Sequence, residues 1–279
     1  MRVISLGSGS SGNATVIQSG GTTILVDAGF ASRILVSRLR QVGLAPGSVQ
    51  AILLTHEHGD HACGALALAA AYQIPLVSDP LTRKAVERMP ISPESRAVRN
   101  GKIEQVPLDV GRSTRVGTLD VQSFPTSHDA VAPCGFLISG SAWKVCVVTD
   151  TGEATPAVVE AMREAHLLVI EANHDRERLL AGPYPLQLKM RILSATGHLS
   201  NQQTSEALAS TLDDGPRWVW LAHLSRTNNT PALASTQVRD YLRSRGLGHT
   251  RIEVAPPGVG PTWDSSALWN PAPPPTITS

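Results

Sequence analysis

Hydrophobic positions along the chain form short runs that first alternate with turns and later with amphipathic segments. Near the start, residues 2–6, 14–18 and 22–26 are rich in β-branched side chains and are separated by Gly and Ser, a pattern typical of antiparallel strands. Further along, apolar runs of strand length alternate with helical periodicity. We expect further strands at 51–54, 75–77, 120–124, 135–138, 143–148, 167–170, 218–222 and 251–254. We expect helices at 33–42, 62–72, 156–164, 201–210 and after Pro231.

This order of elements predicts an α/β (α+β) chain in which helices cover one face of each of two mixed sheets, a four-layer αβ/βα sandwich. The 279 residues are 42% hydrophobic, which is enough for a sizeable core. We place a single domain at 1–262 and a Pro-rich tail at 263–279, because seven of the 20 prolines lie beyond residue 255. Trp263 and Trp269 are expected to pin part of this tail to the surface.

Composition narrows the possible environments of the protein. No apolar run approaches the roughly 20 residues needed to span a bilayer, and the start of the chain lacks a signal-peptide pattern, so we expect a cytoplasmic protein with no membrane partner. The three cysteines contain no CxxC spacing, which argues against a disulfide framework and a thiolate zinc site. The net charge of +1 gives no general electrostatic case for nucleic-acid binding.

A cluster of potential metal ligands follows the predicted strand at 51–54. His56, His58, Asp60 and His61 lie within six residues, in a loop at the end of a strand that precedes a helix. Imidazole and carboxylate without thiolate suit Zn, Mn or Fe(II), and a carboxylate shared by two ions would help to hold a hydroxide between them. The sequence predicts two divalent metal ions, Mn or Zn, and does not decide between them.

The spacing HxHxDH resembles the defining motif of the metallo-β-lactamase superfamily. This resemblance implies the metallo-β-lactamase fold and a structural role for Asp27, after the strand at 22–26. It also implies three more ligands, His128, Asp150 and His223, each at the end of a predicted strand. We expect His56, His58 and His128 at metal one, Asp60, His61 and His223 at metal two, and Asp150 as the bridge between them.

Further blocks resemble one branch of that superfamily, the YycJ/WalJ family, relatives of RNase J and RNase Z. The matching blocks beyond the metal motif lie at 8–13, 127–130, 149–152, 171–175, 197–201 and 223–229. The resemblance implies a metal-dependent nuclease, in this branch a 5′-to-3′ exonuclease that acts on DNA and is linked to DNA repair, so DNA is favoured over RNA as the partner. About 66 residues separate 150 from 217, too few for the inserted cap domain of RNase J, so its RNA-binding behaviour is not transferred.

Two other histidines are candidate catalytic residues. His198 precedes a predicted helix whose Ser200 and Gln203 match a capping box, so it would lie beside a helix N-terminus, a favourable anion site. It could contact a phosphate, protonate a leaving group, or tie down its loop. His174 is a second candidate, and Asp175 could orient it or cap the next turn.

Several polar residues are candidate substrate contacts, and each also has a plain structural explanation. The first loop could line the cleft with backbone amides or form an ordinary turn, and isolated basic residues are usually solvated. Lys189 and Arg191 are considered as contacts to backbone phosphates on the same terms. The residues expected to contact substrate are Ser10, Ser11, Asn13, Ser200 and Arg226.

The hypothesis is in-line attack on a phosphodiester by a hydroxide activated by two metals, with catalytic roles for Asp60, His174 and His198. Asp60 or Asp150 would orient the hydroxide in addition to binding metal. One alternative is a small-molecule phosphodiesterase or thioester hydrolase of the same fold. The second alternative is a non-catalytic metal protein that binds DNA or another partner. The sequence leaves the oligomeric state open.

Overall fold

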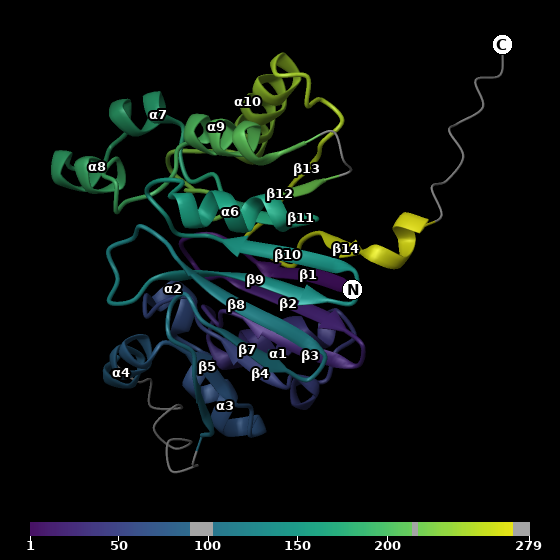
Figure 1. Cartoon of the computed structure of the whole chain (residues 1–279). Helices are drawn as coiled ribbons and strands as arrows, with labels where there is room; N and C mark the ends of the chain where they lie inside the picture. The colour runs from purple at the N-terminus through teal and green to yellow at the C-terminus, as the bar shows by residue number, and fades with distance from the viewer. Residues whose placement is uncertain (90–102, 214–216, 270–279) are drawn as a thin grey trace.

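Two mixed β-sheets face each other in the computed structural model, which describes residues 1–89, 103–213 and 217–269 (Figure 1). The first sheet has the order β14-β1-β2-β3-β4-β5-β6 and the second the order β13-β12-β11-β10-β9-β8-β7. The strands of the first sheet are β1 (Arg2–Gly7), β2 (Ala14–Ser19), β3 (Thr22–Val26), β4 (Ala51–Leu53), β5 (Leu76–Ser78), β6 (Gln105–Pro107) and β14 (Thr262–Asp264). Those of the second are β7 (Ser113–Val116), β8 (Leu119–Pro125), β9 (Cys134–Gly140), β10 (Trp143–Val148), β11 (Leu167–Glu171), β12 (Trp218–Ala222) and β13 (Arg251–Val254).

Helices cover the outer face of each sheet. The first sheet carries α1 (Ser32–Gln41), α2 (Gly59–Ala62), α3 (Ala65–Tyr72) and α4 (Pro80–Arg88). The second sheet carries α6 (Pro156–Glu164), α9 (Asn201–Thr211) and α10 (Pro231–Ser244), with α7 (Arg176–Ala181) and α8 (Leu186–Ile192) beyond them. Short 3₁₀ turns lie at Pro46–Ser48 and Ser265–Trp269. The predicted four-layer αβ/βα sandwich is confirmed.

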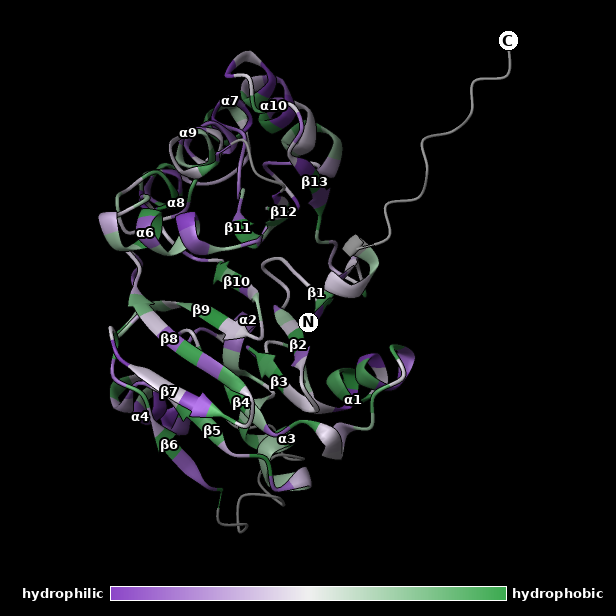
Figure 2. Cartoon of the chain, turned by 45° about the vertical axis from the view of Figure 1, so that its right-hand side comes forward, coloured by the Kyte–Doolittle hydropathy of each residue, from purple (hydrophilic) through white to green (hydrophobic). Residues whose placement is uncertain are grey.

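Three apolar clusters correspond to the spaces between these layers. The central cluster joins side chains of both sheets, such as Val26 and Leu53 to Val147 and Trp220. The other two lie between each sheet and its own helices. Strand β8 shows the cause, because its residues alternate between buried and exposed over Leu119–Ser123 and between apolar and polar colours in Figure 2. Burial of alternate apolar positions therefore fixes which face of β8 meets the core.

Some elements differ from the sequence prediction. The helix expected at 62–72 is divided at Gly64, whose N–H donates to the Ala28 carbonyl 2.9 Å away. A Cβ at Gly64 would lie 2.0 Å from the Phe30 carbonyl oxygen, so only glycine allows this contact. Helices α4, α7 and α8 and the short strands β6 and β7 were not predicted. Helix α4 does carry a readable start signal, Asp79 as N-cap followed by Pro80.

The packed part of the chain extends past residue 262, where the sequence analysis ended the domain. Strand β14 pairs antiparallel with β1, and Trp263 lies in the central apolar cluster with 4% exposure rather than on the surface. The prolines around this strand are typical of a tail, so local pattern did not predict it. Its partner β1 lies at the other end of the sequence. The remainder of the predicted tail, 270–279, and the side chain of Trp269 lie outside the described residues. No helix in the described ranges is long and apolar enough to cross a membrane.

Candidate metal centre

Seven histidine and aspartate side chains converge where strands from both sheets end. One loop after β4 supplies His56, His58, Asp60 and His61, while segments after β8, β10 and β12 supply the other three. The ligand atoms of these seven residues fall into two groups, in each of which all atoms lie within 4.8 Å of one another, and a third group of the same kind joins Asp150 and His223 to Glu171 and His198. The first group is His56, His58, His128 and Asp150, and the second is Asp60, His61, Asp150 and His223. The structure thus brings together all seven metal ligands expected from the sequence, in the two groups expected.

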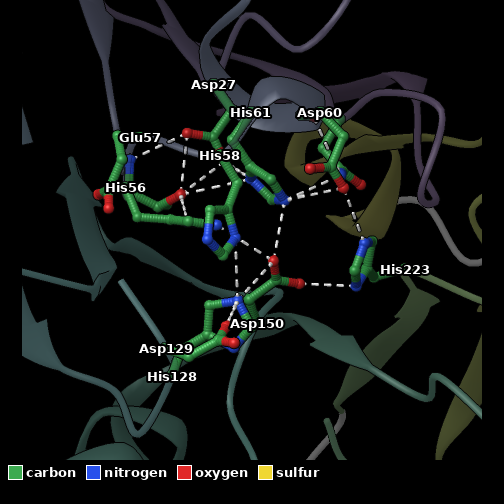
Figure 3. A network of polar contacts seen from close by, with 12 residues as sticks. Asp27, His56, Glu57, His58, Asp60, His61, His128, Asp129, Asp150 and His223 are labelled. Atoms are coloured by element: carbon green, nitrogen blue, oxygen red, sulfur yellow. Dashed lines mark hydrogen bonds and ion pairs between the residues drawn. The ribbon is translucent and has the colours of Figure 1, made fainter. Parts of the chain in front are cut away.

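Asp150 lies between the two groups, as Figure 3 shows. Its Oδ2 atom is 3.3 Å from His56 Nε2 and 3.6 Å from His128 Nε2 in the first group. The same oxygen is 3.1 Å from His61 Nε2 in the second group. One carboxylate oxygen therefore faces donor atoms on both sides, which is the position that a bridging ligand requires.

The rings of the cluster are oriented by contacts on their outer nitrogens. His61 Nδ1 lies 2.7 Å from Asp27 Oδ2, His128 Nδ1 lies 3.0 Å from the Gly197 carbonyl, and His56 Nδ1 lies 3.0 Å from Thr55 Oγ1. The opposite nitrogen of each ring faces the cluster. Such outer partners fix the tautomer of metal-binding histidines.

Asp27 holds the loop of the HxHxDH motif in place. Its Oδ1 accepts a hydrogen bond of 2.9 Å from the Thr55 backbone N–H, and its Oδ2 contacts His61. Asp27 itself adopts a left-handed backbone conformation with φ of 60°, and His223 does the same with φ of 52°. Non-glycine residues adopt this region at a cost of order 1–3 kcal/mol, so the surrounding contacts must enforce it at both positions.

Glu171 is a site residue that the sequence analysis did not single out. It ends β11, is fully buried, and places Oε1 2.8 Å from His223 Nδ1 and 2.8 Å from His198 Nδ1. Its Oε2 accepts hydrogen bonds of 3.2 Å from the N–H groups of Thr151 and Leu199. The sequence does carry a signal for this role, because Glu171 directly follows the apolar run Leu167–Ile170. A carboxylate at the end of a buried strand needs polar partners.

The buried carboxylates make the centre strongly attractive to positive charge. Burial by itself would lower the pKa of His61, but Asp150 and Asp27 raise that pKa to about 10. The pKa of His223 is raised well above its usual value by Asp150, Asp60 and Glu171, against the effect of burial. Burial would raise the pKa of Asp60, but His223 and His61 lower it to about 2. A cation at the centre would satisfy the same carboxylates in place of these protons.

Two further contacts fit a centre built for metal ions. His56 Nε2 is buried and faces Asp150 Oδ2, yet it makes no hydrogen bond among the described residues, and burial lowers its pKa to about 4. His58 Nδ1 and His128 Nε2 face each other at 3.2 Å. Imidazole nitrogens and carboxylate oxygens aimed at one small volume are the ligand set of Zn, Mn and Fe(II) sites.

A pocket of about 190 Å³ adjoins the cluster. His198 and Asp129 form part of its wall together with α8. His198 is partly exposed, and because Nδ1 is held by Glu171, its other nitrogen is free of that contact. Glu171 and Asp150 raise the pKa of His198 against the effect of burial. The lining residues are Ser10, Asp129, Asn173, Tyr184, Leu188, Arg191, Ile192, Gly197, His198 and Ser225.

The expected contacts of the first loop divide between the pocket and the interior. Ser10 lines the pocket, whereas the exposed Ser11 does not. Asn13 is buried, and its Nδ2 lies 3.0 Å from His61 Nε2 and 3.3 Å from the Asp60 carbonyl. Gly29 permits this packing, because a Cβ there would lie 1.7 Å from the Asp60 carbonyl oxygen. The structure therefore makes Asn13 a support for the metal loop rather than a residue open to substrate.

Ser200 and Arg226 do not line the pocket. Ser200 caps α9 in a capping box with Gln203, as the sequence predicted, and this contact occupies its hydroxyl. Arg226 is exposed, and the pocket is lined by the neighbouring Ser225 instead. Of the two basic residues considered, Arg191 lines the pocket and donates to Asp129, while Lys189 donates to the Leu180 carbonyl.

His174, the second catalytic candidate, lies in the protein interior. Its side chain is fully buried, it belongs to neither ligand group, and it does not line the pocket. The backbone at His174 forms a parallel bridge with Ser200, and neither nitrogen of the buried ring has a hydrogen-bond partner among the described residues. Asp175 was expected either to orient His174 or to cap the next turn. It caps α7 by accepting a hydrogen bond from the Arg178 N–H.

Comparisons with known proteins agree with this geometry. A family model described as a β-lactamase superfamily domain matches residues 22–224. The chain is 36% identical to exodeoxyribonuclease WalJ of Streptococcus pneumoniae, over 87% of this chain and 88% of that protein. It is 34% identical to exodeoxyribonuclease YycJ of Bacillus anthracis, over 87% and 89% of the two chains. The metallo-β-lactamase fold protein YhfI of Bacillus subtilis shares the fold, with a TM-score of 0.69, 18% identity, and coverage of 94% and 98%.

Proposed function

The chain belongs to the metallo-β-lactamase superfamily and, within it, to the WalJ/YycJ branch, and from this premise we propose that it is a metal-dependent 5′-to-3′ DNA exonuclease. Its His/Asp cluster is the centre that binds divalent metal. The observation that carries the proposal is the similarity to two named exodeoxyribonucleases over 87% of the chain. A phosphodiester of DNA is the substrate that this similarity supports.

We assign the metal ligands to two sites on the basis of the two donor groups. His56, His58 and His128 would hold one ion, Asp60, His61 and His223 would hold the other, and Asp150 Oδ2 would bridge them. An oxygen- and nitrogen-donor set without thiolate suits Mn and Zn alike. Two such ions would supply a Lewis acid for the phosphate and a water of lowered pKa.

The residues of the chain itself place the substrate and move the proton. His198 stands between the cluster and the pocket, and Glu171 fixes its ring through Nδ1, so the remaining nitrogen is the one free to give a proton to the departing oxygen. Asp60 and Asp150 would orient the attacking water in addition to their ligand role. The partly apolar wall of α8 would keep bulk water from the scissile bond.

The test is digestion of DNA and RNA labelled at either the 5′ or the 3′ end, with Mn, Zn and Mg compared. We expect DNA to be degraded with loss of the 5′ label first, and His58→Ala to abolish this activity. The position of the label that is lost first reports the direction of digestion, and the metal comparison reports which ions support cleavage. Intact DNA after incubation with wild-type protein in every metal would refute the proposal.

The same assay separates the alternative functions. Hydrolysis of a small diester or a thioester without DNA cleavage would indicate a small-molecule hydrolase of the same fold. DNA affinity without turnover of any substrate would indicate a binding protein with structural metals. A cytoplasmic location and a role in DNA repair stay predictions from the sequence.

A further inference from the structure

The pocket beside His198 has two buried polar side chains in its lining, Asn173 with 4% exposure and Ser225 with 7%. Asn173 Nδ2 donates to the His223 carbonyl at 2.9 Å, but its Oδ1 accepts no hydrogen bond from the described residues. Ser225 Oγ accepts from the Asn228 N–H at 3.2 Å, and its own O–H has no acceptor in the same part of the chain. The Ser225 N–H donates to the Asn173 carbonyl at 2.8 Å, so the two residues are neighbours. The buried end of the pocket thus offers one acceptor and one donor that lack partners, which buried polar groups rarely do.

Another part of the lining is apolar and comes from α8 and the turn before it. Tyr184, Leu188 and Ile192 follow one another at intervals of four residues, the spacing that places side chains on one side of a helix. Tyr184 lies between Pro183 and Pro185, and Pro185 is the N-cap of α8. Proline fixes its own φ and restricts the residue before it to extended conformations, so the backbone at Tyr184 has little freedom. The ring of Tyr184 is therefore held ready to pack on a flat ligand.

The size and chemistry of the pocket fit one nucleobase. Its volume of about 190 Å³ is below the roughly 300–1,000 Å³ of pockets that hold whole drug-sized ligands. A base has two faces that stack on aromatic and apolar side chains, and donors and acceptors along its edge. The apolar lining matches the faces, and the two buried polar groups match the edge. Because the Ser225 hydroxyl can both donate and accept, the match does not depend on which of the four bases is present.

The position of His198 indicates which nucleotide enters the pocket. His198 belongs to the pocket lining and, through Glu171, to the metal centre, and its N–H donates to the Ile192 carbonyl at 3.0 Å. The oxygen that His198 protonates therefore belongs to the nucleotide on the pocket side of the scissile bond. A strand cannot continue through a pocket of this size, so that nucleotide is the last one of its strand. In digestion from the 5′ end, the departing atom is the 3′ oxygen of the terminal nucleotide.

We propose that this pocket binds the 5′-terminal nucleoside of the DNA strand, with its base packed on Tyr184 and the edge of the base bonded to Asn173 and Ser225. The attacking hydroxide bonds to phosphorus, the bond from phosphorus to the 3′ oxygen breaks, and His198 gives that oxygen its proton. The rest of the strand, paired or unpaired, lies outside the pocket, so each cleavage releases one nucleotide. This inference rests on the proposed nuclease function and names the part of the substrate that the pocket receives.

The test is calorimetric binding of thymidine 5′-monophosphate to metal-loaded protein, with deoxyribose 5-phosphate as the matched ligand that lacks the base. We expect Tyr184→Ala to weaken binding of the nucleotide about tenfold and to change binding of the sugar phosphate less than twofold. Tyr241→Ala is the control variant, since Tyr241 is also partly exposed and its helix α10 lies apart from α8 in both Figure 1 and Figure 2. It should bind both ligands as wild type does. With end-labelled DNA, wild-type protein should release mononucleotides from the first turnover.

Three results would overturn the inference: equal affinity of wild type and Tyr184→Ala for the nucleotide, an equal loss of affinity for the sugar phosphate, or release of dinucleotides and longer fragments as the first product of wild type. Metal content of both variants, measured in parallel, checks that the centre is intact. If wild-type protein cleaves no DNA, the nuclease proposal fails, and nucleotide binding still decides what the pocket holds. If wild type cleaves DNA and Tyr184→Ala binds the nucleotide equally well, the pocket inference fails while the nuclease stands.

Discussion

The two sheets contribute to the metal centre in different ways. The first sheet provides one continuous loop, His56–His61, and a single buried carboxylate, Asp27, supports it through the Thr55 N–H and His61. The second sheet provides His128, Asp150 and His223 from separate segments, and a single buried carboxylate, Glu171, connects several of these segments. Both carboxylates lie at the end of a strand and contact the outer nitrogen of a histidine in the second ligand group.

The two carboxylates, Asp27 and Glu171, differ in how many segments of the chain they contact. Asp27 supports only the segment that contains Thr55 and His61, whereas Glu171 binds His223 and His198 and also accepts from the N–H groups of Thr151 and Leu199. A site assembled from distant segments needs such a shared support, because no local backbone fixes the distances between them. We therefore expect the two halves of the centre to respond differently to equivalent substitutions.

The largest effect is expected where the halves meet. Asp150→Ala removes the oxygen that faces His56, His61 and His128, so both halves lose their common partner. We expect bound metal to fall by at least half and DNA cleavage to fall to the level of His58→Ala. Metal content by mass spectrometry and end-labelled digestion measure this. Full metal content with normal cleavage would show that the halves do not share Asp150.

Substitutions of Asp27 and Glu171 should have effects of intermediate size on activity, and the two effects should differ. Asp27→Asn and Glu171→Gln keep the size of the side chain and remove its charge, and each should weaken metal affinity about 10–100-fold. At saturating metal, Asp27→Asn should recover most of kcat, while Glu171→Gln should not, because it also frees His198. Titrations of activity with metal, followed by kcat at the plateau, make the comparison. Equal recovery in both variants would contradict the wider role of Glu171.

The smallest effect concerns His174, which lies in the half of the protein supported by Glu171 but contacts no ligand group. Its pKa is lowered to about 4, mainly by burial, so the unfolded chain takes up the proton first as the pH falls from 6.5 toward 4. Folding stability is thus lost over that window. His174→Leu removes this loss, and we expect its stability relative to wild type to improve by about 2 kcal/mol between pH 7.5 and pH 5.

Urea unfolding of both proteins at the two pH values measures this difference. Cleavage of DNA at pH 7.5 should be nearly unchanged in the variant, since the ring of His174 does not line the pocket. A stability difference that is the same at both pH values would show that the buried ring does not titrate in this window. Loss of cleavage with intact folding would instead support the predicted catalytic role of His174.

Much of the fold was readable from local pattern. The runs at 22–26, 145–148 and 218–222 identify strands because each is buried on both faces between a sheet core and helices. Short edge strands such as β6 and β7 were missed because three or four residues with partial exposure carry little periodicity. Helix α8 was missed for a related reason, since it buries no residue and shows no apolar stripe directed at the core.

The sequence by itself determined the ligand cluster and the superfamily, because His56 to His61 follow one strand and their spacing is a local property of the chain. Only the tertiary structure decided the roles of residues far apart in sequence. It joined Glu171 to His198 and His223, buried His174 away from the pocket, and placed Trp263 in the core beside the first strand. Spacing reports which way neighbouring side chains point, whereas the contacts of distant strand ends depend on how the two sheets pack.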